Sequence, residues 1–134
     1  MADFRFKFAF FCDEVRQEDN GKSLIIGAMT SGAVAAKSFP MTKRFLSVFV
    51  VAETSLNVFN LRYRVLMKGS KEVIRSGSAR FEADGDESPE LIPIDFGIDL
   101  HGLELKSPGE YQLQMSLEQQ RWKTLTSLKV LQVD

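Results

Sequence analysis

The sequence predicts an all-β fold, an antiparallel β-sandwich of about eight strands with immunoglobulin-like or related Greek-key topology. Apolar and polar residues alternate in several segments, turn residues recur roughly every 8 to 15 residues, and no segment keeps the helical period of roughly 3.6 residues. The chain has 134 residues, of which 44% are hydrophobic and 26% are charged. This size and balance suit a single globular domain over residues 1–134.

The first strand is expected over residues 4–12, where phenylalanine occupies every even position from Phe4 to Phe10. A period of two is typical of a half-buried strand, so these rings should share one buried face. A polar connection follows, in which Asp19-Asn20-Gly21 favours a chain reversal. We therefore expect residues 4–12 to form a hairpin with a second strand over residues 23–29.

The middle of the chain contains three further strand candidates. Residues 33–37 suit either a helical turn or an edge strand. Residues 44–53 form a nearly continuous β-prone run, which is typical of a central strand covered on both faces. Residues 59–67 alternate again and lead into Gly69-Ser70, which suits a two-residue type II′ turn with glycine in the first position.

The remaining strands follow at similar spacing. Residues 71–83 should return as the hairpin partner, with a bulge expected at Gly77. Residues 92–100 alternate, and Pro93 favours an edge position or the start of a strand. Two last strands are expected over residues 111–117 and 122–133.

The alternation also predicts which side chains form the core. The residues expected to be buried are Phe4, Phe6, Phe8, Phe10, Tyr63, Val65, Phe96, Leu113 and Met115. Cys12 shares the parity of the even-numbered phenylalanines, so we expect it in or beside the core as a small apolar residue. Tyr111 follows Pro108-Gly109, an arrangement that resembles the corner of immunoglobulin-like sandwiches, where a tyrosine hydroxyl anchors the turn.

The charge balance bears on the class of partner. There are 17 lysines and arginines against 18 acidic residues, which argues against a protein that coats nucleic acid or a membrane surface. No apolar run reaches the roughly 20 residues that cross a bilayer. Together with a single cysteine, these features predict a soluble cytoplasmic protein with no membrane or nucleic-acid partner.

Charge is distributed unevenly along the chain. Residues 1–81 carry 13 basic and 7 acidic residues, whereas residues 82–134 carry 4 basic and 11 acidic residues. Opposite charges meeting across neighbouring strands would explain this asymmetry within one domain.

Enzyme signatures are absent from the sequence. It contains no glycine-rich phosphate loop, no Gly-x-Ser-x-Gly and no His-Glu-x-x-His. Cys12 and His101 are the only cysteine and histidine, and neither lies in a recognised nucleophile context. One of each is also too few for a four-ligand zinc site. From these absences we expect no catalysis, no metal and no cofactor.

A basic surface is the most concrete functional expectation. A two-residue turn at Gly69-Ser70 would pair Lys68 with Lys71, Leu66 with Val73, and Arg64 with Arg75. The basic residues placed on one face are Arg62, Arg64, Lys68, Lys71 and Arg75. Like charges opposite each other destabilise a sheet, so acidic groups should offset them.

Those acidic groups could come from two sources. One is the chain itself, through Asp95, Asp99 or Glu104, and the other is a protein partner with an acidic surface. No aromatic residue is expected on the basic face, which argues against binding of single-stranded nucleic acid by base stacking.

A second charged cluster lies in the first connection. Its members are Asp13, Glu14, Arg16 and Glu18, with Asp19 and Lys22 close by in the sequence. If Arg16 bridged two carboxylates, the cluster would be a local ion-pair network that stabilises the connection. The alternative is that the cluster binds a partner or ligand. The acidic residues Asp84, Asp86 and Glu87 form another loop cluster, far short of a complete calcium loop because Ca²⁺ needs six to eight oxygens.

The opening residues also carry a resemblance. The phrase Phe-Cys-Asp-Glu-Val-Arg-Gln-Glu over residues 11–18, then Gly21-Lys22 and Leu-Ile-Ile-Gly over residues 24–27, resembles a family of small uncharacterised bacterial and phage domains. Ala28-Met29 departs from that family, which commonly has a β-branched residue and an aromatic there. The resemblance implies an all-β sandwich and no assigned reaction.

These observations favour a non-catalytic module for protein–protein interaction or an accessory role. The alternative is a domain that binds a small ligand or an ion through the loop clusters at residues 13–19 or 84–87.

Overall fold

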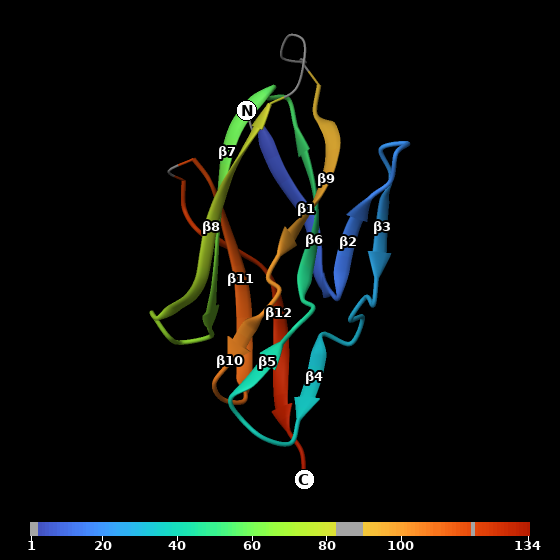
Figure 1. The fold of residues 1–134 in the computed structure, drawn as a ribbon. Helices are drawn as coiled ribbons and strands as arrows, with labels where there is room; N and C mark the ends of the chain where they lie inside the picture. Colours follow the sequence, from blue (N-terminus) through green and yellow to red (C-terminus); the bar gives the residue numbers. More distant parts are fainter. Residues whose placement is uncertain (1–2, 83–89, 119) are drawn as a thin grey trace.

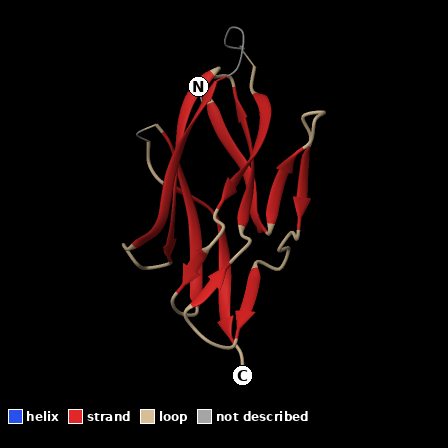
Figure 2. Ribbon diagram, viewed as in Figure 1, coloured by secondary structure: helices blue, strands red, loops and turns tan. Residues whose placement is uncertain are grey.

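The computed structural model describes residues 3–82, 90–118 and 120–134, and in these residues it is all-β, with twelve strands and no helix (Figure 2). The expectation of about eight strands was too low, because several short strands lie in segments that the sequence marks as connections. Within the same residues, no helix has the length and apolar character needed to cross a membrane.

Two larger sheets and two small ones contain these strands (Figure 1). The five-stranded sheet, in the order β4-β12-β11-β7-β8, contains β4 (Ala33–Ala36), β7 (Val58–Met67), β8 (Val73–Glu82), β11 (Gly109–Leu117) and β12 (Lys123–Gln132). The three-stranded sheet, in the order β1-β6-β9, contains β1 (Phe4–Cys12), β6 (Ser47–Thr54) and β9 (Ile92–Asp99). The small sheets pair β2 (Glu14–Gln17) with β3 (Ser23–Ile26), and β5 (Met41–Lys43) with β10 (Leu103–Leu105).

Several strand positions follow the expectations from the sequence. β6 lies centrally between β1 and β9, as the β-prone run indicated. β9 is an edge strand with Pro93 as its second residue, where a missing backbone N–H costs least. Residues 33–36 form an edge strand, which was one of the two alternatives for this segment. β4 pairs with β12 in parallel, so the expectation of a wholly antiparallel sheet was wrong.

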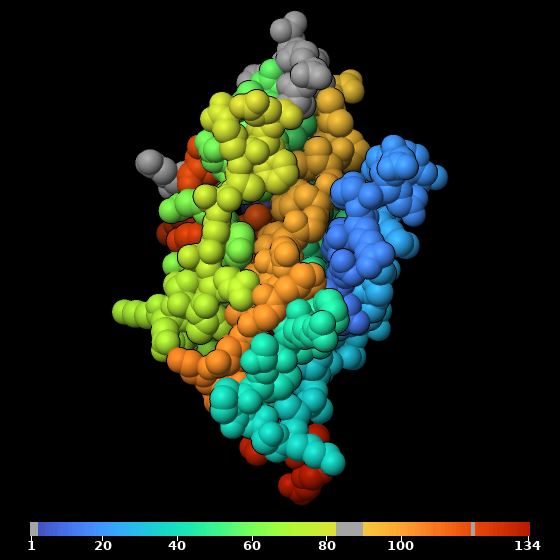
Figure 3. All heavy atoms as spheres, in the orientation of Figure 1, coloured from blue at the N-terminus to red at the C-terminus, as the bar shows by residue number. Residues whose placement is uncertain are grey.

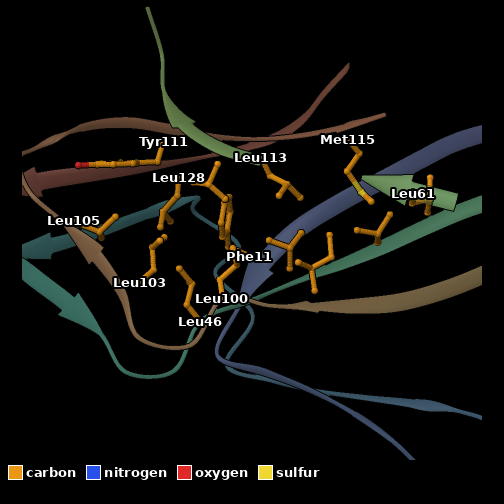
Figure 4. Close-up of a cluster of buried hydrophobic side chains, with 14 of the residues drawn as sticks. Phe11, Leu46, Leu61, Leu100, Leu103, Leu105, Tyr111, Leu113, Met115 and Leu128 are labelled. Atoms are coloured by element: carbon orange, nitrogen blue, oxygen red, sulfur yellow. The ribbon is translucent and has the colours of Figure 1, made fainter. Parts of the chain in front are cut away.

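The core lies between the two larger sheets and draws on both. Phe11 from β1 and Leu61, Leu113 and Leu128 from the five-stranded sheet belong to one cluster of buried side chains (Figure 4). Val65, Leu113 and Met115 are buried as predicted. The predicted residues that are only half-buried are Phe4, Phe6, Phe10, Tyr63 and Phe96.

The expectation that Phe8 is buried was wrong, because β1 contains a bulge. Phe6 pairs with Ala52 and Phe8 with Val51, so Lys7 is an extra residue without a partner on β6. The bulge reverses which residues face the core: Phe11 becomes 2% exposed and Phe8 is 54% exposed. Phe8 and Phe10 instead stack on the outer face, with ring centroids 6.4 Å apart.

The expected hairpin of residues 4–12 with residues 23–29 was also wrong. β1 pairs with β6, and the polar connection itself forms β2, which pairs with β3. The tight turn between β2 and β3 is closed by the Glu18 N–H, which donates to the Lys22 carbonyl at 2.8 Å. The bend at Asp13 therefore separates β1 from the β2–β3 hairpin, which is shorter than the hairpin expected from the sequence.

The β2–β3 hairpin lies on the outer face of the three-stranded sheet. Val15 lies so close to Gly97 of β9 that a Cβ atom added to this glycine would be 2.7 Å from the Val15 Cβ. The Ser23 hydroxyl donates to Asp95 of β9 at 2.6 Å. This third layer explains why Cys12, at the end of β1, is fully buried although it faces away from the main core.

The expected tyrosine corner is present. The Tyr111 hydroxyl donates to the Ser107 carbonyl at 2.6 Å, and its ring is buried in the core. The hydroxyl thus satisfies a turn carbonyl at the entry of β11, which fixes the corner.

Candidate interaction surface

The basic residues predicted to share one face are divided by the β7–β8 hairpin. Leu66 pairs with Val73 as expected, but Arg64 pairs with Ser76, and Arg75 pairs with Val65. The cause is a bulge that leaves Ile74 without a partner, instead of the bulge expected at Gly77. Arg75 therefore faces the other side, and its Nη2 donates to the His101 carbonyl at 3.3 Å.

The turn of this hairpin also differs from the prediction. The Ser70 N–H donates to the Met67 carbonyl at 2.9 Å, so Lys68 and Gly69 are the central residues and glycine is second. Gly69 has a φ of 85°, a left-handed conformation that favours glycine. Lys68 forms an ion pair with Glu110 at 3.4 Å instead of lying opposite Lys71, which is exposed at the turn.

Arg62 and Arg64 remain together on the outer face of the five-stranded sheet, where they flank Trp122. The guanidinium carbon of Arg64 lies 4.3 Å from the centroid of the indole ring, and that of Arg62 lies 4.8 Å from it. Cation–π contacts of this kind contribute roughly 0.5 to 2 kcal/mol. We call these three residues the arginine–tryptophan cluster.

Polar side chains of β11 hold the cluster in place. Arg64 Nε donates to the Gln114 side-chain oxygen at 2.8 Å, and Arg62 Nη2 donates to the Ser116 hydroxyl at 3.2 Å. Arg62 Nε is buried and has no hydrogen-bond partner among the described residues. An unsatisfied buried N–H costs roughly 1 to 3 kcal/mol. The contacts of Arg62 with Trp122 and Ser116 offset this cost.

No carboxylate in the described part of the chain forms an ion pair with either arginine of the cluster. The cross-strand neighbours of Arg62 and Arg64 on β8 are Ser78 and Ser76, which are uncharged. Nearby acidic residues are engaged elsewhere, since Glu118 accepts from Asn60, Glu110 pairs with Lys68, and Glu82 pairs with Arg80.

The acidic residues considered as internal partners lie elsewhere. Asp95 and Asp99 are on β9 of the three-stranded sheet, where they accept hydrogen bonds from the Ser23 hydroxyl and the His101 N–H. Glu104 is exposed on β10 and forms no ion pair among the residues described. The expectation that these three residues neutralise the positive charge of the basic face is therefore wrong for Arg62 and Arg64.

The comparisons with known proteins cover this surface and almost all of the fold. A model of a family of unknown function, DUF6941, matches residues 7–131. The chain belongs to the DUF6941 family. This agrees with the resemblance of the opening residues to an uncharacterised family. No curated protein matches the DUF6941 chain.

In the DUF6941 chain, Glu14 and Arg16 of the loop cluster lie on β2, whereas Asp13 precedes this strand and Glu18 follows it. Arg16 Nη2 lies 3.1 Å from Glu14 Oε2, two residues away on β2, and Arg16 has no second carboxylate partner in the described residues. Asp13 packs its side chain against Gly27, and Glu18 is held at the turn by its backbone. The expected fork of Arg16 between carboxylates is therefore absent from this part of the chain.

The other acidic cluster, residues 84–87, lies outside the described residues. Within residues 3–82, 90–118 and 120–134, no group of three or more histidine, cysteine or acidic side chains is placed to hold a metal ion.

Cys12 and His101 have separate structural roles. Cys12 is fully buried as expected, but beside the β2–β3 hairpin and not on the core face that its parity indicated. His101 Nδ1 accepts the Leu46 N–H at 2.9 Å, so the imidazole positions the loop that leads into β6. Accepting at Nδ1 places the proton of the neutral ring on Nε2.

The Cys12 thiol should make stability fall at high pH. Burial raises the pKa of Cys12 above its ordinary value of 9.0, and the nearby Asp13 carboxylate raises this pKa further. The folded state therefore keeps the proton to higher pH than the unfolded chain, and this stabilising contribution is lost as pH rises past 9.0 through the folded pKa.

We expect the free energy of unfolding in urea to fall more steeply between pH 8.5 and 10.5 for the native chain than for Cys12→Ala. Equal slopes for the two proteins would contradict this assignment.

Trp122 is the site residue that sequence reasoning missed. The aromatic-free basic face predicted from the alternation was wrong, because Trp122, expected as the first residue of the last strand, precedes β12 and lies against Arg62 and Arg64. Gln114 and Ser116 lie beside Arg64 and Arg62 because β11 pairs with β7, and only the sheet order shows this.

Proposed function

We propose that this DUF6941 chain is a non-catalytic protein-interaction module with β-sandwich architecture, and that the arginine–tryptophan cluster binds an acidic surface of a partner. The observation that supports this is the stack of two guanidinium groups on Trp122 without a carboxylate from the described residues. A free thiol in a chain with one cysteine suits a reducing compartment such as the cytoplasm.

Arg64 is well placed to bind a carboxylate. Its Nε is used by Gln114, and its terminal nitrogens have no hydrogen bond to a described residue. Two parallel hydrogen bonds from a guanidinium to a carboxylate are among the strongest polar contacts in proteins. Stacking on Trp122 already restricts the side chain, so less rotamer entropy is lost when a partner binds.

The outer face around the cluster suits a protein surface more than a deep ligand site. Its neighbours are uncharged polar side chains on the two strands that flank β7: Ser76 and Ser78 on β8, and Gln114 and Ser116 on β11. Aromatic and arginine residues are enriched at the centres of protein interfaces, where they contribute much of the binding energy.

Replacement of Arg64 should weaken binding of an acidic probe. We expect Arg64→Glu to reduce the affinity for a fluorescein-labelled ten-residue peptide rich in glutamate and tyrosine by at least about tenfold, measured by fluorescence anisotropy. Repulsion between the new carboxylate and the peptide is the reason. The free energy of unfolding should fall by no more than about 2 kcal/mol, because the contact with Trp122 is lost while repulsion from Arg62 is relieved.

The matched control is Lys71→Glu, which makes the same change of charge at an exposed turn. Its effect on peptide affinity should stay within about twofold, as expected for a charge outside the contact surface. In cells, a photo-crosslinking residue at Gln112 should give a protein adduct that Arg64→Glu abolishes and Lys71→Glu preserves. Equal effects of the two variants on both readouts would contradict the proposal.

A further inference from the structure

A gap between β8 and β9 separates the two larger sheets at one side of the molecule. Within the described parts of the chain, β8 pairs only with β7, and β9 pairs only with β6. No backbone hydrogen bond among the described residues joins the other edge of either strand to a neighbour. Figure 3 shows β8 in yellow-green and β9 in orange, with a recess between them that reaches toward the interior.

Two adjoining hollows occupy this gap and have largely apolar walls. One has a volume of about 200 Å³ and reaches Leu61 and Met115 of the core, and the other has a volume of about 230 Å³ and reaches Phe59. Phe81 and Phe96 line both hollows, and their rings meet between them at 5.1 Å. Ala79 is exposed although it faces the inner side of its strand.

The charged residues of the gap are acidic. Among the described residues that line the hollows, Glu82, Asp95 and Asp99 are acidic and none is a lysine or arginine, although Glu82 forms an ion pair with Arg80 at 2.7 Å. Asp95 accepts a hydrogen bond from Ser23, and Asp99 is largely exposed. An occupant of this gap should therefore carry positive charge beside its apolar side chains.

We propose that the gap between β8 and β9 binds an extended segment of a partner protein in which apolar side chains alternate with lysine or arginine. Such a segment would add as a strand to one free edge, and its backbone would form the hydrogen bonds that this edge lacks. Alternate side chains of a strand point to opposite sides, so the apolar ones enter the hollows and the basic ones meet Asp95 and Asp99.

This surface is distinct from the arginine–tryptophan cluster. Ala79 and Phe81 face the gap, whereas Ser76 and Ser78 of the same strand face the cluster. The two surfaces also have opposite charge, so they select different partner segments. Failure of one proposal therefore leaves the other standing.

The test uses three labelled ten-residue peptides. The first alternates valine with lysine, the second has glutamate in place of lysine, and the third is the lysine peptide with alternate backbone nitrogens methylated. We expect the lysine peptide to bind at least tenfold more tightly than either of the others, and to shift amide resonances of β8 or β9 in NMR spectra. Equal binding of the three peptides, or shifts confined to other strands, would overturn the proposal.

Variants of the chain locate the binding site. Ala79→Trp should fill one hollow from an exposed position and weaken the lysine peptide at least tenfold, while Ser78→Trp on the opposite face of β8 should leave its affinity within about twofold. Asp95→Lys provides a second test without added bulk, and should weaken the lysine peptide and favour the glutamate peptide. Arg64→Glu should leave the lysine peptide no weaker. A folded Ala79→Trp and a folded Asp95→Lys that both bind like the native chain would overturn the assignment.

Discussion

Phe11→Ala should lower the free energy of unfolding by about 3 to 5 kcal/mol, because it removes a buried ring and leaves a cavity in the core. Phe11 is 2% exposed and belongs to the cluster between the two larger sheets. Phe8→Ala, three residues earlier in the same strand, should cost less than about 1 kcal/mol, since Phe8 is 54% exposed on the outer face. Urea unfolding of both variants measures the difference.

The pair also tests the bulge at Lys7. A regular strand with the period of the even-numbered phenylalanines would bury Phe8 and expose Phe11, and would reverse the order of the two effects. A larger loss for Phe8→Ala than for Phe11→Ala would therefore show that β1 pairs with β6 without the bulge.

Gly97→Leu should detach the β2–β3 hairpin from the three-stranded sheet. A side chain at this position would overlap Val15, whose Cβ lies 2.7 Å from where a Cβ of residue 97 would be. Overpacking of this kind costs roughly 1 to 3 kcal/mol. Amide hydrogen exchange over residues 14–26 should accelerate by at least about tenfold, since local opening of the hairpin becomes easier.

The control for this variant is Ala79→Leu, which adds the same side chain to an exposed edge position beside a hollow. It should leave exchange in the hairpin unchanged and alter the free energy of unfolding by less than about 0.5 kcal/mol. Unchanged exchange over residues 14–26 in Gly97→Leu would mean that the hairpin does not depend on its contact with Gly97.

Local patterns of the sequence predicted which segments form strands and several of their positions. The all-β class, the central β6, the edge at Pro93 and the corner at Tyr111 all follow from alternation, β propensity or turn residues. These features depend on a few neighbouring residues, so they can be recognised without knowing the sheet order.

Register and layer could not be predicted in the same way. A bulge changes which face every later residue occupies, yet neither Lys7 nor Ile74 differs in type from a regular strand residue. The sequence therefore placed Phe8 in the core and Arg75 on the basic face, and the structure moves both residues to the opposite side.

The candidate site was predicted in part. Arg62 and Arg64 were identified from their alternation, but their contact with Trp122 joins residues about sixty positions apart, through a sheet order that no local pattern contains. Lys68 was assigned to the same face, and its ion pair with Glu110 likewise depends on the neighbouring strand β11.

The bulge in β1 also affects how this chain tolerates changes in length. Lys7 has no partner on β6, and the pairs on either side of it, Phe6 with Ala52 and Phe8 with Val51, are consecutive along β6. Deletion of Lys7 would bring β1 into regular pairing without moving any other side chain to a new face, and Arg5 would still hold Glu53. The even spacing of the phenylalanines thus depends on one bulged residue, Lys7. Homologues without a residue at this position would place their phenylalanine rings in the same way with a different spacing in the sequence.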